Sequence, residues 1–159
     1  MDAKEFGAFI LQRRKELSLS QAALAEKLNV TAKGDQVDFI MLGCPHYSVN
    51  QLWHVYDKMK GKKVKDGIEF WVFVPRQIRF LAERSGILQP LLDAGVKVMS
   101  DGCPCMGRTR PKGSNLVATD SAKQAHYLPN FTGIQALYGS TEECIHAAIT
   151  GKWEGHLKY

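Results

Sequence analysis

The chain has 159 residues, of which 45% are hydrophobic and 23% are charged, and its formal net charge is +5 at pH 7. This balance is typical of a globular protein with one full core. The longest apolar runs are far shorter than a bilayer, which excludes a membrane-spanning protein. The amphipathic first residues do not resemble a signal peptide, so we expect a cytoplasmic protein.

Residues 4–30 predict two helices that are joined by a turn at 17–20. The string from Arg14 to Thr31 resembles the opening of helix-turn-helix domains of the lambda-repressor and Cro type. In that family Gln21, at the start of the second helix, commonly contacts a DNA phosphate, and a recognition helix follows. Here residues 32–37 lead directly into an apolar strand, so the recognition helix is missing. We interpret residues 1–34 as a truncated helix-turn-helix-like hairpin and do not expect sequence-specific DNA binding.

A nearly continuous apolar run, Phe39–Leu42, predicts a buried parallel strand. Ser48, with a glutamine three residues later, forms the capping-box pattern that starts a helix over residues 50–59. Cys44 and His46 lie between the two elements, at the carboxyl end of the strand. In open α/β sheets this is the edge where ligands bind, and the free N–H groups of the following helix favour anions there.

Strands and helices continue to alternate after this unit. Further strands are predicted at 68–74, the second of the series and fully buried, and at 96–99, 115–119 and 134–138. Helices are predicted from Pro75, near Leu88, after the cap Ser121 with Gln124, and after a capping box of Ser140 and Glu143. In the helix after Pro75, the core face is expected to hold Ile78, Leu81 and Ala82. The alternation predicts an α/β domain over residues 38–153, a three-layer parallel sheet with helices on both faces, beside the N-terminal helical hairpin.

Polar or reactive groups follow each predicted strand, and the ends of parallel strands converge on one edge of a sheet. Thiolates from two strand ends, Cys44 and Cys103, could therefore meet a metal or cluster, since soft sulfur ligands select iron–sulfur clusters, zinc or copper(I). Cys103-Pro104-Cys105 is too short a spacing for the usual zinc knuckle, so at most one of these two is expected to act with Cys44. The alternative is that the cysteines are ordinary buried thiols, which suits Cys144 in the middle of a helix.

Four tracts, in the same order, resemble the C-terminal part of the large subunit of the aconitase X family. They are Gly43-Cys44-Pro45-His46-Tyr47-Ser48, Asp101-Gly102-Cys103-Pro104-Cys105, residues 118–127, and residues 139–153 with Cys144. The family contains archaeal phosphomevalonate dehydratases and bacterial hydroxyproline dehydratases. These are hydro-lyases that use an iron–sulfur cluster and a separate or fused small subunit.

The resemblance implies that Cys44 and the cysteine after Asp101 ligate an iron–sulfur cluster whose type it does not fix. Cys103 is favoured because it lies closest to the strand end, while Cys105 stays open as the matching cysteine or as a further ligand. The implied substrate is a small anionic hydroxy acid. The catalytic candidates are Ser121, Lys123 and His46, and the substrate-binding candidates are Ser48, His126 and Ser140.

The large subunit of that family is much longer than this chain, and its N-terminal part helps to build the active site. We therefore expect an incomplete active site here, with an N-terminal half and a small subunit as the missing partners. Two alternatives stay open: a DNA-binding regulator whose α/β domain senses a small anion, and an inactive remnant.

Overall fold

The computed structural model describes residues 32–155 and the isolated positions 12, 16 and 23. Within this part of the chain lies a five-stranded, wholly parallel sheet in the order β3-β2-β1-β4-β5. The strands are β1 Phe39–Leu42, β2 Glu69–Val74, β3 Val96–Ser100, β4 Leu116–Thr119 and β5 Gln135–Tyr138. The predicted parallel sheet is confirmed. The predicted hairpin over residues 1–34 falls almost entirely outside the described residues.

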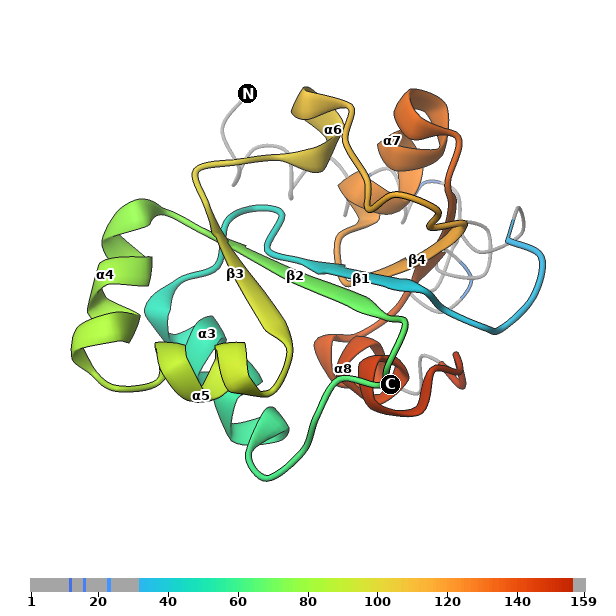
Figure 1. Cartoon of the computed structure of the whole chain (residues 1–159). Coiled ribbons are helices and arrows are strands. Elements are labelled where there is room, and N and C mark those ends of the chain that lie inside the picture. Colours follow the sequence, from blue (N-terminus) through green and yellow to red (C-terminus); the bar gives the residue numbers. More distant parts are fainter. Residues whose placement is uncertain (1–11, 13–15, 17–22, 24–31, 156–159) are drawn as a thin grey trace.

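The helices form two layers, one on each face of the sheet (Figure 1). They are α3 Val49–Met59, α4 Arg76–Arg84, α5 Leu88–Asp93, α6 Pro104–Gly107, α7 Ala122–Thr132 and α8 Thr141–Thr150. Helices α3, α4, α5 and α8 pack on one face, and α6 and α7 pack on the other. Because crossovers are right-handed, a chain that builds outward from β1 in both directions must place its helices on both faces. The predicted three layers are confirmed.

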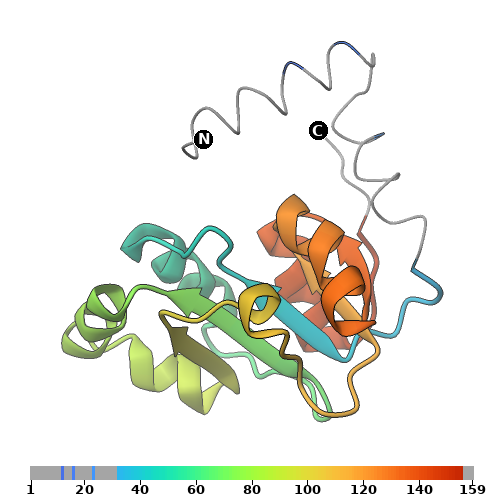
Figure 2. The ribbon, with the colours of Figure 1, turned by 90° about the horizontal axis from the view of Figure 1, so that it is seen from above.

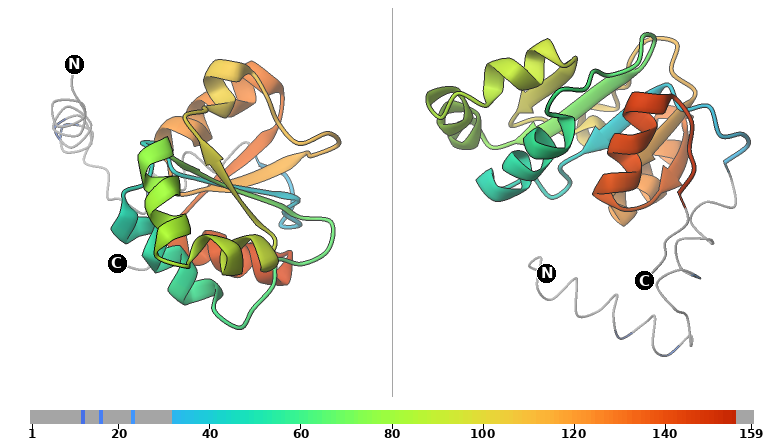
Figure 3. Two further views of the ribbon diagram at one scale, coloured as in Figure 1. Left: turned by 60° about the vertical axis from the view of Figure 1, so that its left-hand side comes forward. Right: turned by 90° about the horizontal axis from the view of Figure 1, so that it is seen from below.

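Strand β1 is the centre of the core, and each of its four residues is at most 1% exposed. Phe39 and Met41 face α6 and α7, whereas Ile40 and Leu42 face the opposite layer, as the alternation of a strand requires. On that opposite side α8, α3 and α5 lie side by side beneath the sheet (Figure 3, right). Among the described residues, no helix is long and apolar enough to cross a membrane.

The predicted helix caps at Ser48 and Ser140 are confirmed. Ser48 accepts a bond from the N–H of Gln51, and Ser140 accepts one from the N–H of Glu143; in both cases the third-position side chain bonds back to the cap. The two capping boxes fix where α3 and α8 begin, which is at the carboxyl edge of the sheet.

Two packing predictions were wrong. Leu81 is 47% exposed, because α4 lies at the end of the sheet and buries only Ala82 completely. Strand β2 is not fully buried, because Glu69 and Trp71 are half-exposed on the face that carries α6 and α7 (Figure 2), where Phe73 is the residue of this strand that is buried. Glu69 compensates by pairing with Lys97 on β3, at 2.6 Å.

Candidate functional site

The carboxyl ends of β1 and β4 lie next to each other at the centre of the sheet. From this pair the chain leaves in opposite directions, to β2 on one side and to β5 on the other. In doubly wound sheets such a reversal opens a crevice outside the strand ends, and ligands bind there. At this edge the segments that follow β1 and β4 begin at Gly43 and at Asp120.

Three thiols meet on the α6 and α7 side of this edge. Cys105 is 5% exposed in the apolar cluster that these helices form with the sheet, and Cys44 and Cys103 are half-buried against the same cluster. Cys44 follows β1, whereas Cys103 and Cys105 arrive on the segment that crosses from β3 into α6. We call Cys44, Cys103 and Cys105 the thiol cluster.

The pKa of Cys105 responds to its neighbours in the thiol cluster. Burial raises the pKa of Cys105 to about 11, and charges on Cys103 and Cys44 act in the same direction. The ammonium of Lys123, in the first turn of α7, opposes this rise in the pKa of Cys105. Lys123 therefore lies within electrostatic range of the thiol cluster, and Cys105 is a neutral thiol at pH 7.

The amide of Gln124 joins two members of the thiol cluster. Its side chain is fully buried, its Nε2 donates to Cys103 Sγ at 3.6 Å, and its Oε1 accepts from Cys105 Sγ at 2.7 Å. Because Gln124 belongs to α7, this amide ties the segment after β3 to the helix after β4.

The segment after β3 is also held to its neighbours on the sheet. Asp101, at φ 54°, accepts a bond from the backbone N–H of Arg76 at 2.9 Å and a second from its guanidinium. The backbone bond and then the guanidinium bond lower the pKa of the Asp101 carboxyl. His46 donates from Nε2 to the Gly102 carbonyl at 2.7 Å, which leaves Nδ1 as its proton-accepting nitrogen when the ring is neutral.

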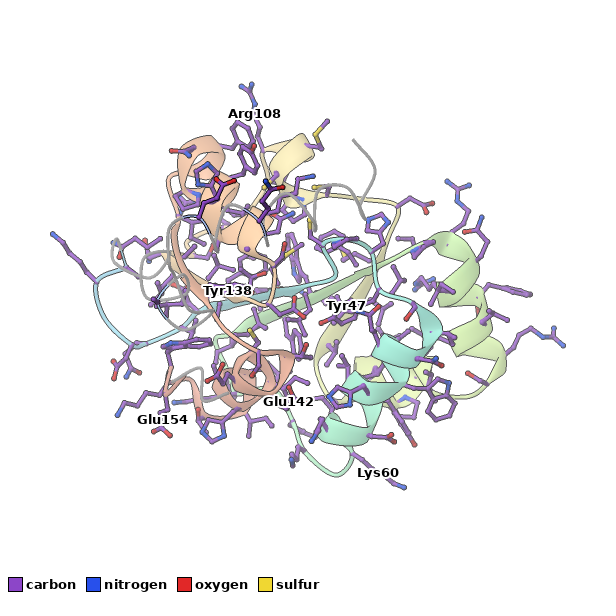
Figure 4. The ribbon with its side chains drawn as sticks, turned by 180° about the vertical axis from the view of Figure 1, so that it is seen from behind. Tyr47, Lys60, Arg108, Tyr138, Glu142 and Glu154 are labelled. Atoms are coloured by element: carbon purple, nitrogen blue, oxygen red, sulfur yellow. The ribbon has the colours of Figure 1, made fainter. Side chains whose placement is uncertain are left out.

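A second polar network lies on the α3 and α8 side of the same edge (Figure 4). The Tyr47 hydroxyl and the Thr141 hydroxyl both donate to Oδ2 of Asp120, the latter at 2.8 Å. Burial raises the pKa of the Asp120 carboxyl and, more strongly, the pKa of Tyr47. Beside it opens a cavity of about 200 Å³, lined by Tyr47, Asn50, Gln51, His54 and Thr141.

The remaining candidates from the sequence lie around this edge in different ways. Ser121 is 4% exposed, and its hydroxyl accepts the N–H of Gln124 at 3.3 Å as the cap of α7. The hydroxyls of Ser48 and Ser140 likewise cap their own helices. His126 is exposed one turn beyond Lys123 on α7, with its ring 4.9 Å from that of Tyr127. The structure therefore brings together the thiols, His46 and Lys123, whereas the three serines are engaged as caps.

The thiol cluster fits an iron–sulfur cluster in its donor chemistry, since such clusters are held by cysteine thiolates. Three thiols packed against one apolar cluster at a ligand-binding edge supply that kind of donor. Within residues 32–155 and the isolated positions, however, no three His, Cys, Asp or Glu side chains are already arranged to hold a metal ion. The donors fit, but the described part of the chain does not form a complete, preassembled ligand set.

Sequence reasoning missed two contacts at this edge, those of Gln124 with the thiols and of Tyr47 with Asp120, although it named Gln124 as the capping partner of Ser121. Gln124 is a polar residue at a position of α7 that the helical period places with the buried Ala125 and Leu128. That mismatch was a usable signal, because a buried amide needs partners. Tyr47 lay within the tract after the first strand, but nothing in the local pattern indicated that it reaches Asp120.

Comparison with known proteins gives the same family over almost all of the described chain. Residues 37–150 match the family described as the aconitase X third domain. The cis-3-hydroxy-L-proline dehydratase of Hypocrea jecorina is 34% identical over 129 residues, which are 80% of this chain and 22% of that enzyme. The phosphomevalonate dehydratase large subunit of Methanocaldococcus jannaschii is 34% identical over 120 residues, 76% of this chain and 29% of that subunit.

Among solved structures, the holo form of Thermococcus kodakaraensis aconitase X has the same fold. The TM-score is 0.64 at 24% sequence identity, and the match covers 77% of this chain and 32% of that one. The chain thus spans roughly a quarter of the length of the curated relatives it matches, 22% and 29% for the two named above.

Proposed function

This chain belongs to the aconitase X family, and we propose that its α/β domain, residues 38–153, supplies part of the active site of an iron–sulfur-dependent hydro-lyase. The observation that carries the proposal is the meeting of the thiol cluster with Lys123 at the carboxyl edge of the sheet. Its substrate would be a small anionic hydroxy acid, in line with the hydroxyproline and phosphomevalonate after which the two related dehydratases are named. A cytoplasmic location is part of the proposal, since all four cysteines are free thiols.

Cys44 and Cys103 would hold the cluster, and a bound cluster with an open iron supplies a Lewis acid that polarises a substrate hydroxyl. The cluster type is left open. Lys123 would bind the carboxylate or phosphate of the substrate, because its ammonium is exposed in the first turn of α7, where the helix dipole also favours an anion.

Removal of the neighbouring proton requires a base at the same edge. His46 is one candidate, because its bond to Gly102 leaves Nδ1 able to accept a proton. Ser121 is the other, although its hydroxyl is 4% exposed and is engaged as the cap of α7. Ser48, Ser140 and His126 stay predictions as substrate contacts.

The rest of the enzyme would dock on an exposed face of α6 and α7. Tyr127 and Phe131 are 41% and 44% exposed, and their rings stack at 5.8 Å. Met106 on α6 is 84% exposed, and the guanidinium of Arg108, at the outer end of α6 (Figure 4), lies 5.9 Å from the Phe131 ring centroid. Exposed aromatic, Met and Arg side chains are typical of protein interfaces.

This face continues from Lys123 along α7, so whatever covers it also borders the thiol cluster. The proposed occupant is the polypeptide that corresponds to the unmatched part of the relatives, most of their length. A small subunit is a further partner in this proposal. A polypeptide that covers the carboxyl edge of the sheet would exclude water from it. It would also supply any further protein ligand that the cluster needs.

Anaerobic reconstitution of the chain with iron and sulfide, followed by ligand titration, tests the proposed function. The ligands are cis-3-hydroxy-L-proline and phosphomevalonate, with their non-hydroxylated analogues as controls. Preferential binding of one hydroxy acid, read by calorimetry or NMR, is the expected result. The iron-loaded protein is also assayed together with the remaining polypeptide. If it then neither binds nor dehydrates either acid, the proposal is contradicted.

A further inference from the structure

Gln124 places a primary amide inside an otherwise apolar layer. Its neighbours on the buried stripe of α7 are Ala125 and Leu128, and the whole layer packs on Phe39 and Met41 of β1. Burying an amide is unfavourable unless its donors and acceptor are matched. The bonds of this side chain go to the two sulfurs of Cys103 and Cys105.

Sulfur is a weak hydrogen-bonding partner, so these bonds offset the burial of the amide poorly. An apolar side chain of similar length, such as methionine, would fill the same space without that cost. Packing alone therefore does not explain the amide. What an apolar side chain could not do is form a different hydrogen bond with each of the two thiols. The amide donates to Cys103 and accepts from Cys105.

The backbone makes this distinction between the two thiols possible. Cys103 is the extended N-cap residue of α6, at φ −151° and ψ 119°, and Pro104 opens the helix. Cys105 lies inside the first turn of α6 and is 5% exposed, whereas Cys103 is half-buried. The two side chains thus leave the chain from different backbone conformations, although only one residue separates them.

We propose that Gln124 is a positioning residue that sorts the two thiols, presenting Cys103 at the sheet edge beside Cys44 and holding Cys105 inward as its hydrogen-bond donor. The inference rests on the proposed function, because it assigns Cys103 and not Cys105 to the cluster. Its core, the sorting of the two thiols, is nevertheless a property of the metal-free chain.

The test is alkylation of metal-free protein, with the rate at each cysteine read by mass spectrometry. In the native chain Cys103 reacts faster than Cys105. Gln124→Met removes both bonds at nearly constant side-chain length. The ratio of Cys105 to Cys103 labelling should rise at least about five-fold, because the loss of even one hydrogen bond implies a change of that size. Gln89→Met is the matched control, since it makes the same substitution on α5, where the exposed Gln89 amide donates to Asp93 at 2.8 Å. A folded Gln124→Met with an unchanged ratio overturns the proposal.

A second pair of variants decides the matter if Gln124→Met does not fold. Cys105→Ser keeps a donor for Oε1 of Gln124, and Cys105→Ala removes it. Labelling of Cys103 relative to Cys44 should fall in the alanine variant, because the amide that presents Cys103 loses its anchor, and it should stay native in the serine variant. Equal labelling in both overturns the sorting role.

Iron content after reconstitution then connects the sorting to the proposed function. Cys105→Ser should retain iron, and Cys103→Ser should lose it. Loss of iron in Cys105→Ser overturns the assignment of Cys103 alone. A native chain that binds no iron at all would contradict the proposed function, and the labelling ratios would still decide the role of Gln124.

Discussion

Gly43 lies directly against the backbone of Phe73. A Cβ at Gly43 would come within 2.9 Å of the Phe73 amide nitrogen and closer still to its carbonyl oxygen, and Gly43 has a φ of +92°. The same carbonyl accepts the N–H of Tyr47 at 2.9 Å. The chain after β1 therefore turns closely around the end of β2, and this turn delivers Cys44 to the edge of the sheet.

Gly43→Ala should destabilise the fold by about 2–4 kcal/mol, the sum of a strained φ and a backbone clash. Gly61→Ala is the control, because Gly61 also has a positive φ, +71°, but nothing lies within 4 Å of its Cβ position. Urea unfolding of both variants measures the difference. Equal losses of stability would mean that the contact with Phe73 does not constrain the turn.

Asp120→Asn should change the pH dependence of stability. Burial raises the pKa of Asp120 in the folded state, so its favourable contribution is complete below the unfolded pKa and is lost as pH rises through the folded pKa. Asparagine cannot ionise but still accepts bonds from Tyr47 and Thr141. The variant should therefore gain stability relative to the native chain as the pH increases across that window.

Free energies of unfolding measured from pH 4 upward check this prediction about Asp120. Glu154→Gln serves as the control, since Glu154 is an exposed carboxylate whose neighbour is His146, at 3.4 Å. Parallel curves for the native chain and Asp120→Asn would show that the carboxyl is not perturbed by its burial.

Lys123→Ala should weaken binding of a small carboxylated or phosphorylated hydroxy acid about ten-fold, the loss expected for one charge-assisted contact. Thermal stability should hardly change, because Lys123 is exposed. Lys112→Ala is the control, since Lys112 precedes β4 and so lies at the opposite edge of the sheet. Calorimetric titration with the remaining polypeptide present measures both. Equal affinities for the two variants would leave Lys123 without a role in binding.

Removing the aromatic pair on α7 should disrupt association with the rest of the enzyme. Tyr127→Ser combined with Phe131→Ser should raise the dissociation constant at least ten-fold, because buried aromatic residues dominate interfaces. Phe80→Ser with Leu81→Ser is the matched control, since those side chains on α4 are 57% and 47% exposed. Analytical ultracentrifugation against a polypeptide carrying the remainder of the enzyme provides the measurement. Stronger loss in the α4 variant would place the interface on the other side.

The sequence predicted the architecture well, because its signals were local. The apolar run of β1 and the capping boxes at Ser48 and Ser140 are short patterns whose physics does not depend on distant residues. The exposure of Leu81 and Trp71 was not predictable in the same way, since it depends on how far the helices extend over the sheet.

The site was predicted only in outline. Because the ends of parallel strands converge, the sequence predicted Cys44 and Cys103 at one edge of the sheet. In the structure both side chains pack against the same apolar cluster. The bonds from Gln124 to two sulfurs and from Tyr47 to Asp120 join segments 19 to 73 residues apart. Local sequence patterns carry no information about such pairings, which only the sheet order and the crossing of the β3–α6 segment create.

The most direct measurement is the iron and sulfide content of the anaerobically reconstituted chain, read together with its visible absorption. The native chain should bind both, and the Cys44→Ser, Cys103→Ser double variant should bind neither. Cys144→Ala should behave as the native chain, because Cys144 is fully buried among apolar residues on the other face of the sheet. Iron and sulfide content that is unchanged in the double variant would contradict the assignment of this edge as the cluster site.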